Sequence, residues 1–299
     1  MNEEVLQPAQ SDLREVVFEG GKLTYKAIGE RLSDKPVTVV LPGHGGGIAS
    51  HGRLAEAIQS RLGQQTIITN LVSMDEPGSL SEPVIDVEAR GLLALLQQEG
   101  LANAPVNFVA HSMGALVVER AAEFAKATGY NCFKYERGSR TVFISPAGSI
   151  ERDKPRKLLA RLILKSYPNN KSKREELTAE LPASTGQPNT SSKIKDIRLL
   201  RELGKKRLSY ENLEKSGLKP AIIFYPDDQL FPWDLVAGNP KYIDRIIESA
   251  DGLFSPSGMI DLPKTSAFHP SQADHYTVNF NVEPTADSIV NYFKSSMPA

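Results

Sequence analysis

The sequence lacks several features that mark specialised classes of protein. Its single cysteine, Cys132, excludes an intramolecular disulfide framework and a cysteine-based zinc cluster. No run approaches the roughly 20 apolar residues that span a bilayer, and the first residues resemble no secretory signal. No H-E-x-x-H, G-x-x-x-x-G-K-[ST] or G-x-G-x-x-G pattern occurs, so we expect no metal ion and no nucleotide cofactor. These absences favour a soluble, cytoplasmic protein.

Positive and negative charges nearly balance over the whole chain, but they are unevenly distributed. Lys and Arg number 35 against 36 Asp and Glu, so the chain is no general polyanion binder. Residues 151–219 nevertheless hold 18 Lys and Arg against nine Asp and Glu. Solvated helix faces explain this stretch most simply, and attraction to an anionic substrate or membrane surface is the alternative. Only Tyr167 and Tyr210 are aromatic there, so we expect no nucleic-acid partner.

Short apolar runs alternate with amphipathic patterns along most of the chain. Gly20 and Gly21 separate two alternating segments, which is a hairpin signal. Alternating strands and helices predict the α/β class, with a mainly parallel central sheet and helices on both faces. The predicted strands are 36–41, 65–69, 105–110, 141–145, 221–225 and a weaker 259–262, and the predicted helices are 54–62, 84–98, 115–127 and 285–293.

The alternation stops in the middle of the chain. Residues 149–219 contain no convincing strand and read as helical pieces around a polar loop at 182–192. We therefore predict a basic helical insertion at 149–219, with residues 1–148 and 220–299 forming the α/β core. One helical piece has an apolar face that would cover a pocket as a lid: Leu158, Leu159, Leu162 and Ile163.

The pentapeptide Ala-His-Ser-Met-Gly at 110–114 lies between a predicted strand and a predicted helix. A serine at such a junction occupies a sharp turn, and its hydroxyl projects above the sheet edge. The small residues on either side, Ala110 and Gly114, allow strand and helix to approach closely. Met113 would offer its backbone N–H at the start of the helix. Ser112 is thus a candidate nucleophile; the alternative is an ordinary serine in a tight turn.

A glycine-rich loop, Pro-Gly-His-Gly-Gly-Gly at 42–47, follows the first buried strand. Acyl transfer needs two donors directed at the developing oxyanion, and glycines let the backbone approach a ligand. We expect the Gly46 N–H to be the donor from this loop, with Gly45 as second choice. His44 is interpreted as a residue that braces the loop. The alternative is a flexible turn without a ligand.

A serine hydroxyl also requires a base and an acid that orients it. Of the five histidines, only His269 and His275 follow the central strands, and His275, just ahead of Pro284 and the last helix, is the preferred base. The alternative interpretation of His275 is an ordinary histidine on the surface. Two carboxylates, Asp227 and Asp228, follow the strand at 221–225 and are the candidate acids.

Together these segments resemble α/β-hydrolase-fold serine hydrolases, the family of esterases, lipases and lysophospholipases. The resemblance covers the opening hairpin, the oxyanion loop, the nucleophile turn (with Ala110 for the usual Gly) and the histidine loop. Asp228 through Pro232 resembles the family's D-x-x-x-P turn, which implies Asp228 as the acid. The segment between Leu262 and His275 is longer than is usual in the family, so His269 stays an alternative candidate for the base.

The resemblance implies hydrolysis of a carboxylic ester through an acyl-enzyme, without a cofactor or metal. Ser112 would attack, His275 would transfer the proton, and Asp228 would hold His275. An aminopeptidase, a thioesterase and a C–C bond hydrolase use the same triad, and some members of the fold only bind ligands. The expected partner is a small-molecule ester. An anionic or lipid-like substrate, peripheral membrane contact and the oligomeric state are left open.

Overall fold

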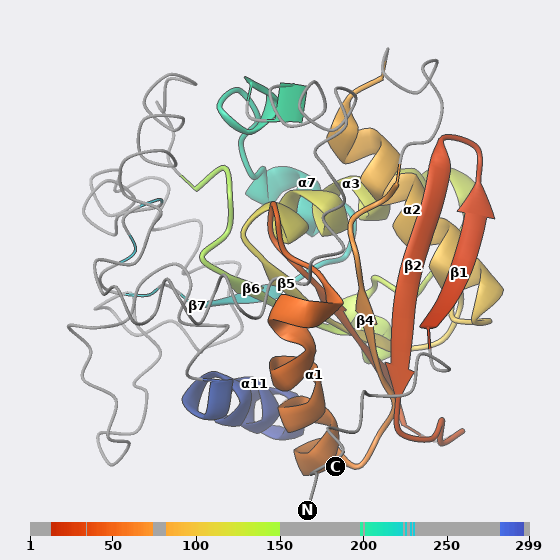
Figure 1. Cartoon of the computed structure of the whole chain (residues 1–299), viewed down its shortest axis with the longest axis vertical. Coiled ribbons are helices and arrows are strands. Elements are labelled where there is room, and N and C mark those ends of the chain that lie inside the picture. Colours follow the sequence, from red (N-terminus) through yellow and green to blue (C-terminus); the bar gives the residue numbers. More distant parts are fainter. Residues whose placement is uncertain are drawn as a thin grey trace, which may run out of the picture.

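A single mixed sheet forms the centre of the molecule (Figure 1). The computed structural model describes residues 13–33, 35–73, 82–149, 198–199, 201–223, 225, 228, 230 and 282–295. The sheet has seven strands in the order β1-β2-β4-β3-β5-β6-β7. Their bounds are Leu13–Phe18 (β1), Gly21–Ile28 (β2), Val37–Leu41 (β3), Thr66–Thr69 (β4), Val106–His111 (β5), Arg140–Ile144 (β6) and Pro220–Ile223 (β7).

The strands divide into an antiparallel edge and a parallel remainder. β1 pairs with β2 and β2 with β4 in antiparallel fashion, whereas β4, β3, β5, β6 and β7 run parallel. The β1–β2 hairpin turns at Gly20 and Gly21, whose φ angles of 112° and 152° suit glycine. This hairpin confirms the turn predicted from the two glycines.

Helices cover both faces of the sheet (Figure 1). One apolar cluster joins Val40 and Val109 to helices α1 (Ile48–Leu62) and α11 (Val282–Ser295). The other joins Val39 and Phe108 to helices α2 (Val84–Gln98) and α3 (Met113–Thr128). A short helix, α7 (Tyr210–Lys215), lies beside α3. Successive residues of one strand thus enter opposite clusters, as expected for buried parallel strands.

These features confirm the predicted fold class, a mainly parallel sheet with helices on both faces. Most predicted elements agree with the structure within two or three residues, and α2 has the predicted bounds. Helix α1 is the exception, since it begins at Ile48, six residues before the predicted Leu54. The weak strand predicted at 259–262 lies outside the described residues.

The end of the predicted insertion packs as part of the core. Residues 150–197 lie outside the described residues, so the lid and its domain boundaries stay predictions. Residues 198–219, however, pack on the face that carries α2 and α3, and the Glu202 carboxylate accepts a 2.8 Å hydrogen bond from the Val84 N–H. Their apolar side chains belong to the same cluster as Phe108: Leu199, Leu203, Leu208, Leu213 and Leu218.

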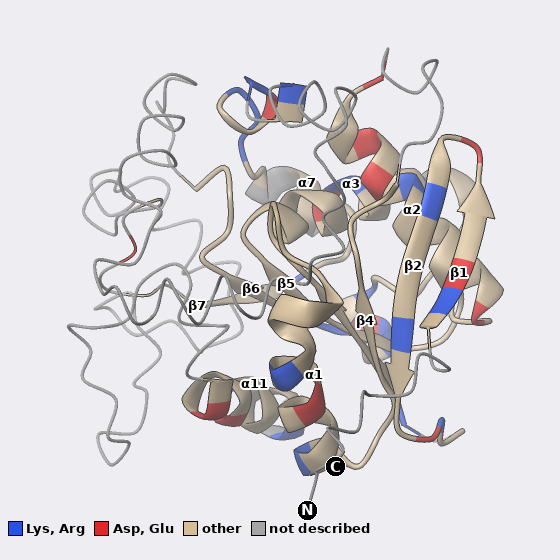
Figure 2. Ribbon diagram, viewed as in Figure 1, with Lys and Arg blue, Asp and Glu red and all other residues tan. Residues whose placement is uncertain are grey.

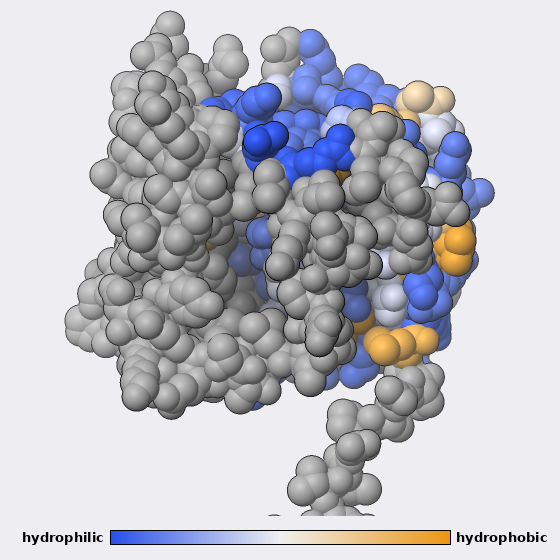
Figure 3. All heavy atoms as spheres, turned by 45° about the horizontal axis from the view of Figure 1, so that its top comes forward, coloured by the Kyte–Doolittle hydropathy of each residue, from blue (hydrophilic) through white to orange (hydrophobic). Residues whose placement is uncertain are grey.

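The described surface is largely hydrophilic on the face shown in Figure 3, with small separate hydrophobic areas. Large apolar side chains stand exposed at Leu13, Val17 and Leu32. Among the described helices, none combines the length and the apolar character needed to cross a bilayer.

Candidate active site

The candidate residues lie at the carboxyl ends of the parallel strands. In open parallel sheets this edge is where ligands bind, because successive loops meet there. The glycine-rich loop follows β3, Ser112 follows β5, Ser145 follows β6, and Asp228 comes shortly after β7. The fold therefore places Ser112 and Asp228 at the same edge of the sheet.

Ser112 is the one residue between β5 and α3, and its backbone is strained. Its φ of 52° and ψ of −115° are unusual for a residue with a side chain. Three hydrogen bonds hold the turn: the Ser112 N–H donates to the Ile144 carbonyl (2.8 Å), and the Ser112 carbonyl accepts from Ala115 (3.2 Å) and Ala147 (3.0 Å). This is the sharp strand-to-helix turn expected for a nucleophile.

Two glycines make room for this turn. A Cβ atom added at Gly114 would lie 2.9 Å from the Leu41 carbonyl oxygen, so α3 crosses close to the end of β3. A Cβ added at Gly43 would lie 2.8 Å from the Ser112 Cβ and 3.4 Å from its Oγ. The glycine-rich loop therefore lies directly against the nucleophile, as its expected function requires.

The amides of that loop are only partly available to a ligand. The Gly46 N–H donates to the Gly43 carbonyl (3.0 Å), and the Gly47 N–H donates to the Ser50 hydroxyl (2.9 Å). The predicted oxyanion donor, Gly46, therefore does not fit this conformation, because its N–H closes the loop's own turn. Gly45, with a φ of 73° and open space beside its Cα, stays a prediction. So does Met113, whose N–H lies at the first position of α3.

A pair of buried histidines lies beside this loop. The His51 Nε2 lies 3.1 Å from the His111 Nδ1, and the His51 Nδ1 lies 2.8 Å from the Ser50 hydroxyl. This pair was not singled out from the sequence. No sequence signal connects residues 60 positions apart.

The preferred acid, Asp228, is almost fully buried, with 1% of its surface exposed. Its N–H donates to the Tyr225 carbonyl (3.1 Å), and its Oδ1 accepts from the Leu230 N–H (2.8 Å). These bonds fix the carboxylate in a turn just beyond β7. The alternative acid Asp227 and both candidate bases, His269 and His275, lie outside the described residues. The geometry of the triad therefore stays a prediction.

Charged residues gather where α2, α3 and residues 202–209 meet (Figure 2). Arg120 binds both carboxylate oxygens of Asp86 at 2.9 Å, and Lys206 approaches the same carboxylate at 3.3 Å. Burial alone would raise the pKa of Asp86, but these two cations outweigh it and lower the pKa. Lys206, one of the basic residues of the predicted insertion, is thus paired with Asp86 while its side chain stays partly exposed.

Glu119 in the middle of α3 was not singled out from the sequence, yet the structure strongly shifts the pKa of its carboxyl group. Burial raises its pKa to about 7, the negative charge of Glu123 adds to the rise, and the Ser209 N–H opposes it. Glu119 faces the last part of the predicted insertion, a segment that contains Ser209. It therefore joins α3 to that segment, away from the sheet edge that carries Ser112.

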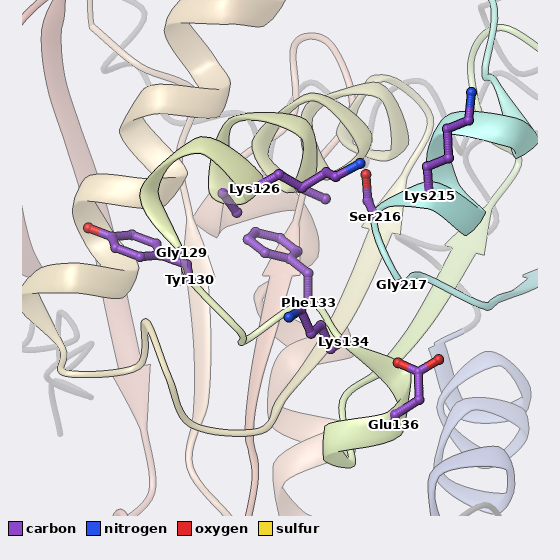
Figure 4. A pocket seen from close by; sticks show the side chains of 11 residues that line it. Lys126, Gly129, Tyr130, Phe133, Lys134, Glu136, Lys215, Ser216 and Gly217 are labelled. Atoms are coloured by element: carbon purple, nitrogen blue, oxygen red, sulfur yellow. The ribbon is translucent and has the colours of Figure 1, made fainter.

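A cavity of about 450 Å³ opens at the far end of α3 (Figure 4). Phe133 and Ala125 line it, and Lys126 points across it toward Ser216. It begins some ten residues along α3 from Ser112, roughly 15 Å at 1.5 Å per residue, so it is distinct from the candidate site. Within the described ranges, no group of three His, Cys, Asp or Glu side chains is arranged to hold a metal ion.

Comparisons with known proteins identify the fold. No family model matches the chain, and neither does any curated protein sequence. Solved structures do match over nearly the whole length. A meta-cleavage product hydrolase from Pseudomonas fluorescens is 15% identical, with a TM-score of 0.64 over 95% of this chain and 98% of that one.

Two further matches have other activities. A serine hydrolase from Cycloclasticus zankles is 11% identical, with a TM-score of 0.61 over 96% of this chain and 99% of that one. A bromoperoxidase from Bacillus anthracis is 15% identical, with a TM-score of 0.61 over 94% and 99%. The chain therefore has the α/β-hydrolase fold predicted from its motifs. Identities this low show the fold alone, and the activities differ among the matches.

Proposed function

We propose that this protein is a serine hydrolase that cleaves a carboxylic ester through an acyl-enzyme intermediate. One observation carries the proposal: Ser112 occupies a strained, hydrogen-bonded turn at the sheet edge of an α/β-hydrolase fold. Strain of this kind costs of order 1–3 kcal/mol and persists only where the surrounding structure enforces it. The buried Asp228 at the same edge adds support, because an orienting acid in a triad is buried and hydrogen-bonded.

The proposed reaction proceeds in two halves. The Ser112 Oγ attacks the ester carbonyl while His275 takes its proton and passes it to the leaving alcohol, which leaves an acyl group on Ser112. Water then attacks the acyl group with the same histidine as base. Asp228 holds the imidazole, and the Met113 N–H with a second amide from residues 43–45 holds the oxyanion.

The substrate proposed is a small-molecule ester. Arg201 and Lys205 are exposed and could attract an anionic or lipid-like group, whereas Lys206 is paired with Asp86. Cys132, the single cysteine, has no partner in the sequence for an intramolecular disulfide, and we infer a cytoplasmic location from this.

Labelling by a fluorophosphonate probe and hydrolysis of p-nitrophenyl esters of increasing chain length test the proposal. We expect Ser112→Ala to abolish both. Ser145→Ala is the matched control, because Ser145 is also buried, also has a positive φ (42°) and directly follows the neighbouring strand β6. We expect this control to keep labelling and turnover.

Full labelling of Ser112→Ala would overturn the assignment of the nucleophile. If the wild type is labelled but hydrolyses no ester, the assignment as a serine hydrolase would stand, and the proposed ester substrate would be wrong. Peptide, thioester and C–C bond substrates would then be tested next. Neither labelling nor turnover would favour a protein of this fold that only binds its ligand.

A further inference from the structure

Two histidines from different elements form a buried pair close to Ser112. His51 lies in the first turn of α1 and His111 is the last residue of β5, immediately before Ser112. They are 2% and 4% exposed, and their facing nitrogens lie 3.1 Å apart. The pair therefore joins the start of α1 to the nucleophile turn through a hydrogen bond shielded from water.

The pair also contacts both ends of the turn in the glycine-rich loop. A Cβ atom added at Gly46 would lie 3.0 Å from the His51 Cε1, and one added at Gly43 would lie 3.2 Å from the His111 Nδ1. Gly43 and Gly46 are joined by the hydrogen bond that closes this turn. The two imidazoles thus pack beneath the segment that approaches Ser112.

Hydrogen bonding continues from the pair back into the loop. The Gly47 N–H donates to the Ser50 hydroxyl, and this hydroxyl lies 3.1 Å from the Gly47 carbonyl and 2.8 Å from the His51 Nδ1. The single Ser50 proton serves either the carbonyl or the imidazole. Either choice fixes which nitrogen of a neutral His51 carries a proton, and thus which histidine donates within the pair. An apolar residue in place of His51 or His111 would interrupt this series of hydrogen bonds.

We propose that His51 and His111 are positioning residues that fix the distance between the oxyanion loop and Ser112. The inference rests on the proposed function, since it concerns the same nucleophile. A backbone donor stabilises the oxyanion only where it lies within hydrogen-bond reach of that atom in the transition state. A loop that is displaced from Ser112 would therefore lose rate more than substrate affinity.

The test compares substitutions that remove the hydrogen bond with substitutions that preserve it. His111→Phe and His51→Phe keep a ring but lose the bond. We expect each to lower kcat by about 100-fold, the size of effect that a 1 Å displacement produces, with KM nearly unchanged. The double variant should be no worse than His51→Phe alone, because that variant already loses the bond to His111 together with the bond to Ser50.

The conservative variants should restore most of the rate. Asparagine places an amide near the Nδ1 position, so His111→Asn should recover kcat to within about 10-fold of the wild type. The longer side chain of His111→Gln would carry its amide past this position, so this variant should not recover kcat. This Asn and Gln comparison keeps the proposal testable even where the phenylalanine variant fails to fold.

A matched control separates positioning from stability. Gln64 and Thr38 form another buried side-chain pair, with 3.1 Å between the Gln64 Nε2 and the Thr38 Oγ1, at the opposite end of β3. Gln64→Leu should lower the melting temperature, as a lost buried hydrogen bond does, but leave kcat unchanged. The rate of fluorophosphonate labelling, which reports Ser112 directly, is measured for every variant.

The outcomes separate the two proposals. A wild type that is labelled, with a folded His111→Phe labelled and turning over at the same rate, would overturn the positioning role alone. If Gln64→Leu and His111→Phe lost kcat equally, the His51–His111 pair would contribute only to stability. A wild type that is not labelled would overturn the serine hydrolase itself, and the positioning role with it.

Discussion

Helices α1 and α3 begin at neighbouring points of one sheet edge, yet their first turns are built in different ways. Helix α3 follows β5 after one strained residue, Ser112, and backbone atoms pack against it on all sides. Helix α1 follows a loop of six residues, and side chains satisfy its first amides: the Ser50 hydroxyl binds the Gly47 N–H, and the Asn70 Oδ1 binds the Ile48 N–H. The start of α3 therefore has no room for added atoms, whereas the start of α1 depends on particular side-chain hydrogen bonds.

The two helices also bury different ionisable groups and use different anchors. Helix α1 buries His51 and is tied to α11 through Arg61, which pairs with Asp287 at 2.7 Å and also with Glu283. Helix α3 buries Glu119 and is tied to α2 through Arg120 and Asp86. We therefore expect substitutions in α3 to have the larger effects, and the predictions below test that order.

The largest effect is expected at the start of α3. Gly114→Val would force carbon atoms against the Leu41 and Pro42 carbonyl oxygens, which lie 2.9 and 3.1 Å from an added Cβ. Because these are backbone atoms, relief requires the helix to move, at a cost of about 3 kcal/mol or more. Urea denaturation measures the change.

Gly45→Ala provides the contrast in the loop before α1. Nothing lies within 4 Å of an added Cβ there, so only the positive φ of 73° is penalised, by about 1–2 kcal/mol. If Gly45→Ala cost as much as Gly114→Val, the comparison of a position crowded by backbone atoms with an open position in the loop would be wrong.

The next effect depends on pH and concerns the middle of α3. Burial raises the pKa of Glu119 to about 7 in the folded protein, from its ordinary value of 4.5. The folded state therefore binds the proton more tightly than the unfolded state does. The resulting stability is fully present below about pH 4.5 and is lost as pH rises through 7, by up to about 3 kcal/mol.

Glu119→Gln should remove this loss, since an amide keeps an oxygen for the Ser209 N–H but carries no charge. We expect the variant to be more stable than the wild type at pH 8 and to approach it at pH 5. Melting temperatures at both pH values measure this difference. Glu136→Gln, at an exposed carboxylate, is the control and should show no such difference. Equal shifts at both pH values would contradict the buried, ionising carboxyl group.

A smaller effect is expected at the helix anchors. Arg120→Met removes a two-bond contact to Asp86, whose side chain is only 15% exposed, and we expect a loss of about 1–2 kcal/mol. Arg61→Met removes contacts to Glu283 and Asp287, which are 64% and 50% exposed, and should cost under about 1 kcal/mol. Denaturation at low and high salt measures both. A larger cost for Arg61→Met would reverse the order of the two anchors.

Much of the fold and the central residue of the site were predictable because their signals are local. The period of the apolar residues gave the bounds of α2, and the Ala-His-Ser-Met-Gly junction located the strained turn at Ser112. The start of α1 was missed because its amide partner, Asn70, lies 22 residues after Ile48. The glycine-rich loop lies against Ser112, but which of its amides closes the turn depends on backbone angles that glycine leaves open.

Contacts between distant segments were beyond sequence reasoning. Glu202 binds the first amide of α2 from 118 residues away, Ser209 binds Glu119 across 90 residues, and His51 meets His111 across 60. Each contact joins an ordinary polar side chain to another side chain or to a backbone amide, with no distinctive spacing. Their pairing follows from how the sheet and helices pack, which only the three-dimensional structure shows.

The smallest effect is expected inside α1 and has the opposite sign. Gly52 lies in the helix interior, and nothing lies within 4 Å of a Cβ added there. Alanine costs less backbone entropy than glycine in a helix, so Gly52→Ala should stabilise the protein by about 0.5–1 kcal/mol, or roughly 2 °C in Tm. Calorimetry measures the shift, and kcat should not change. A destabilised Gly52→Ala would mean that α1, like α3, begins against closely packed atoms, and the contrast between the two helices would fail.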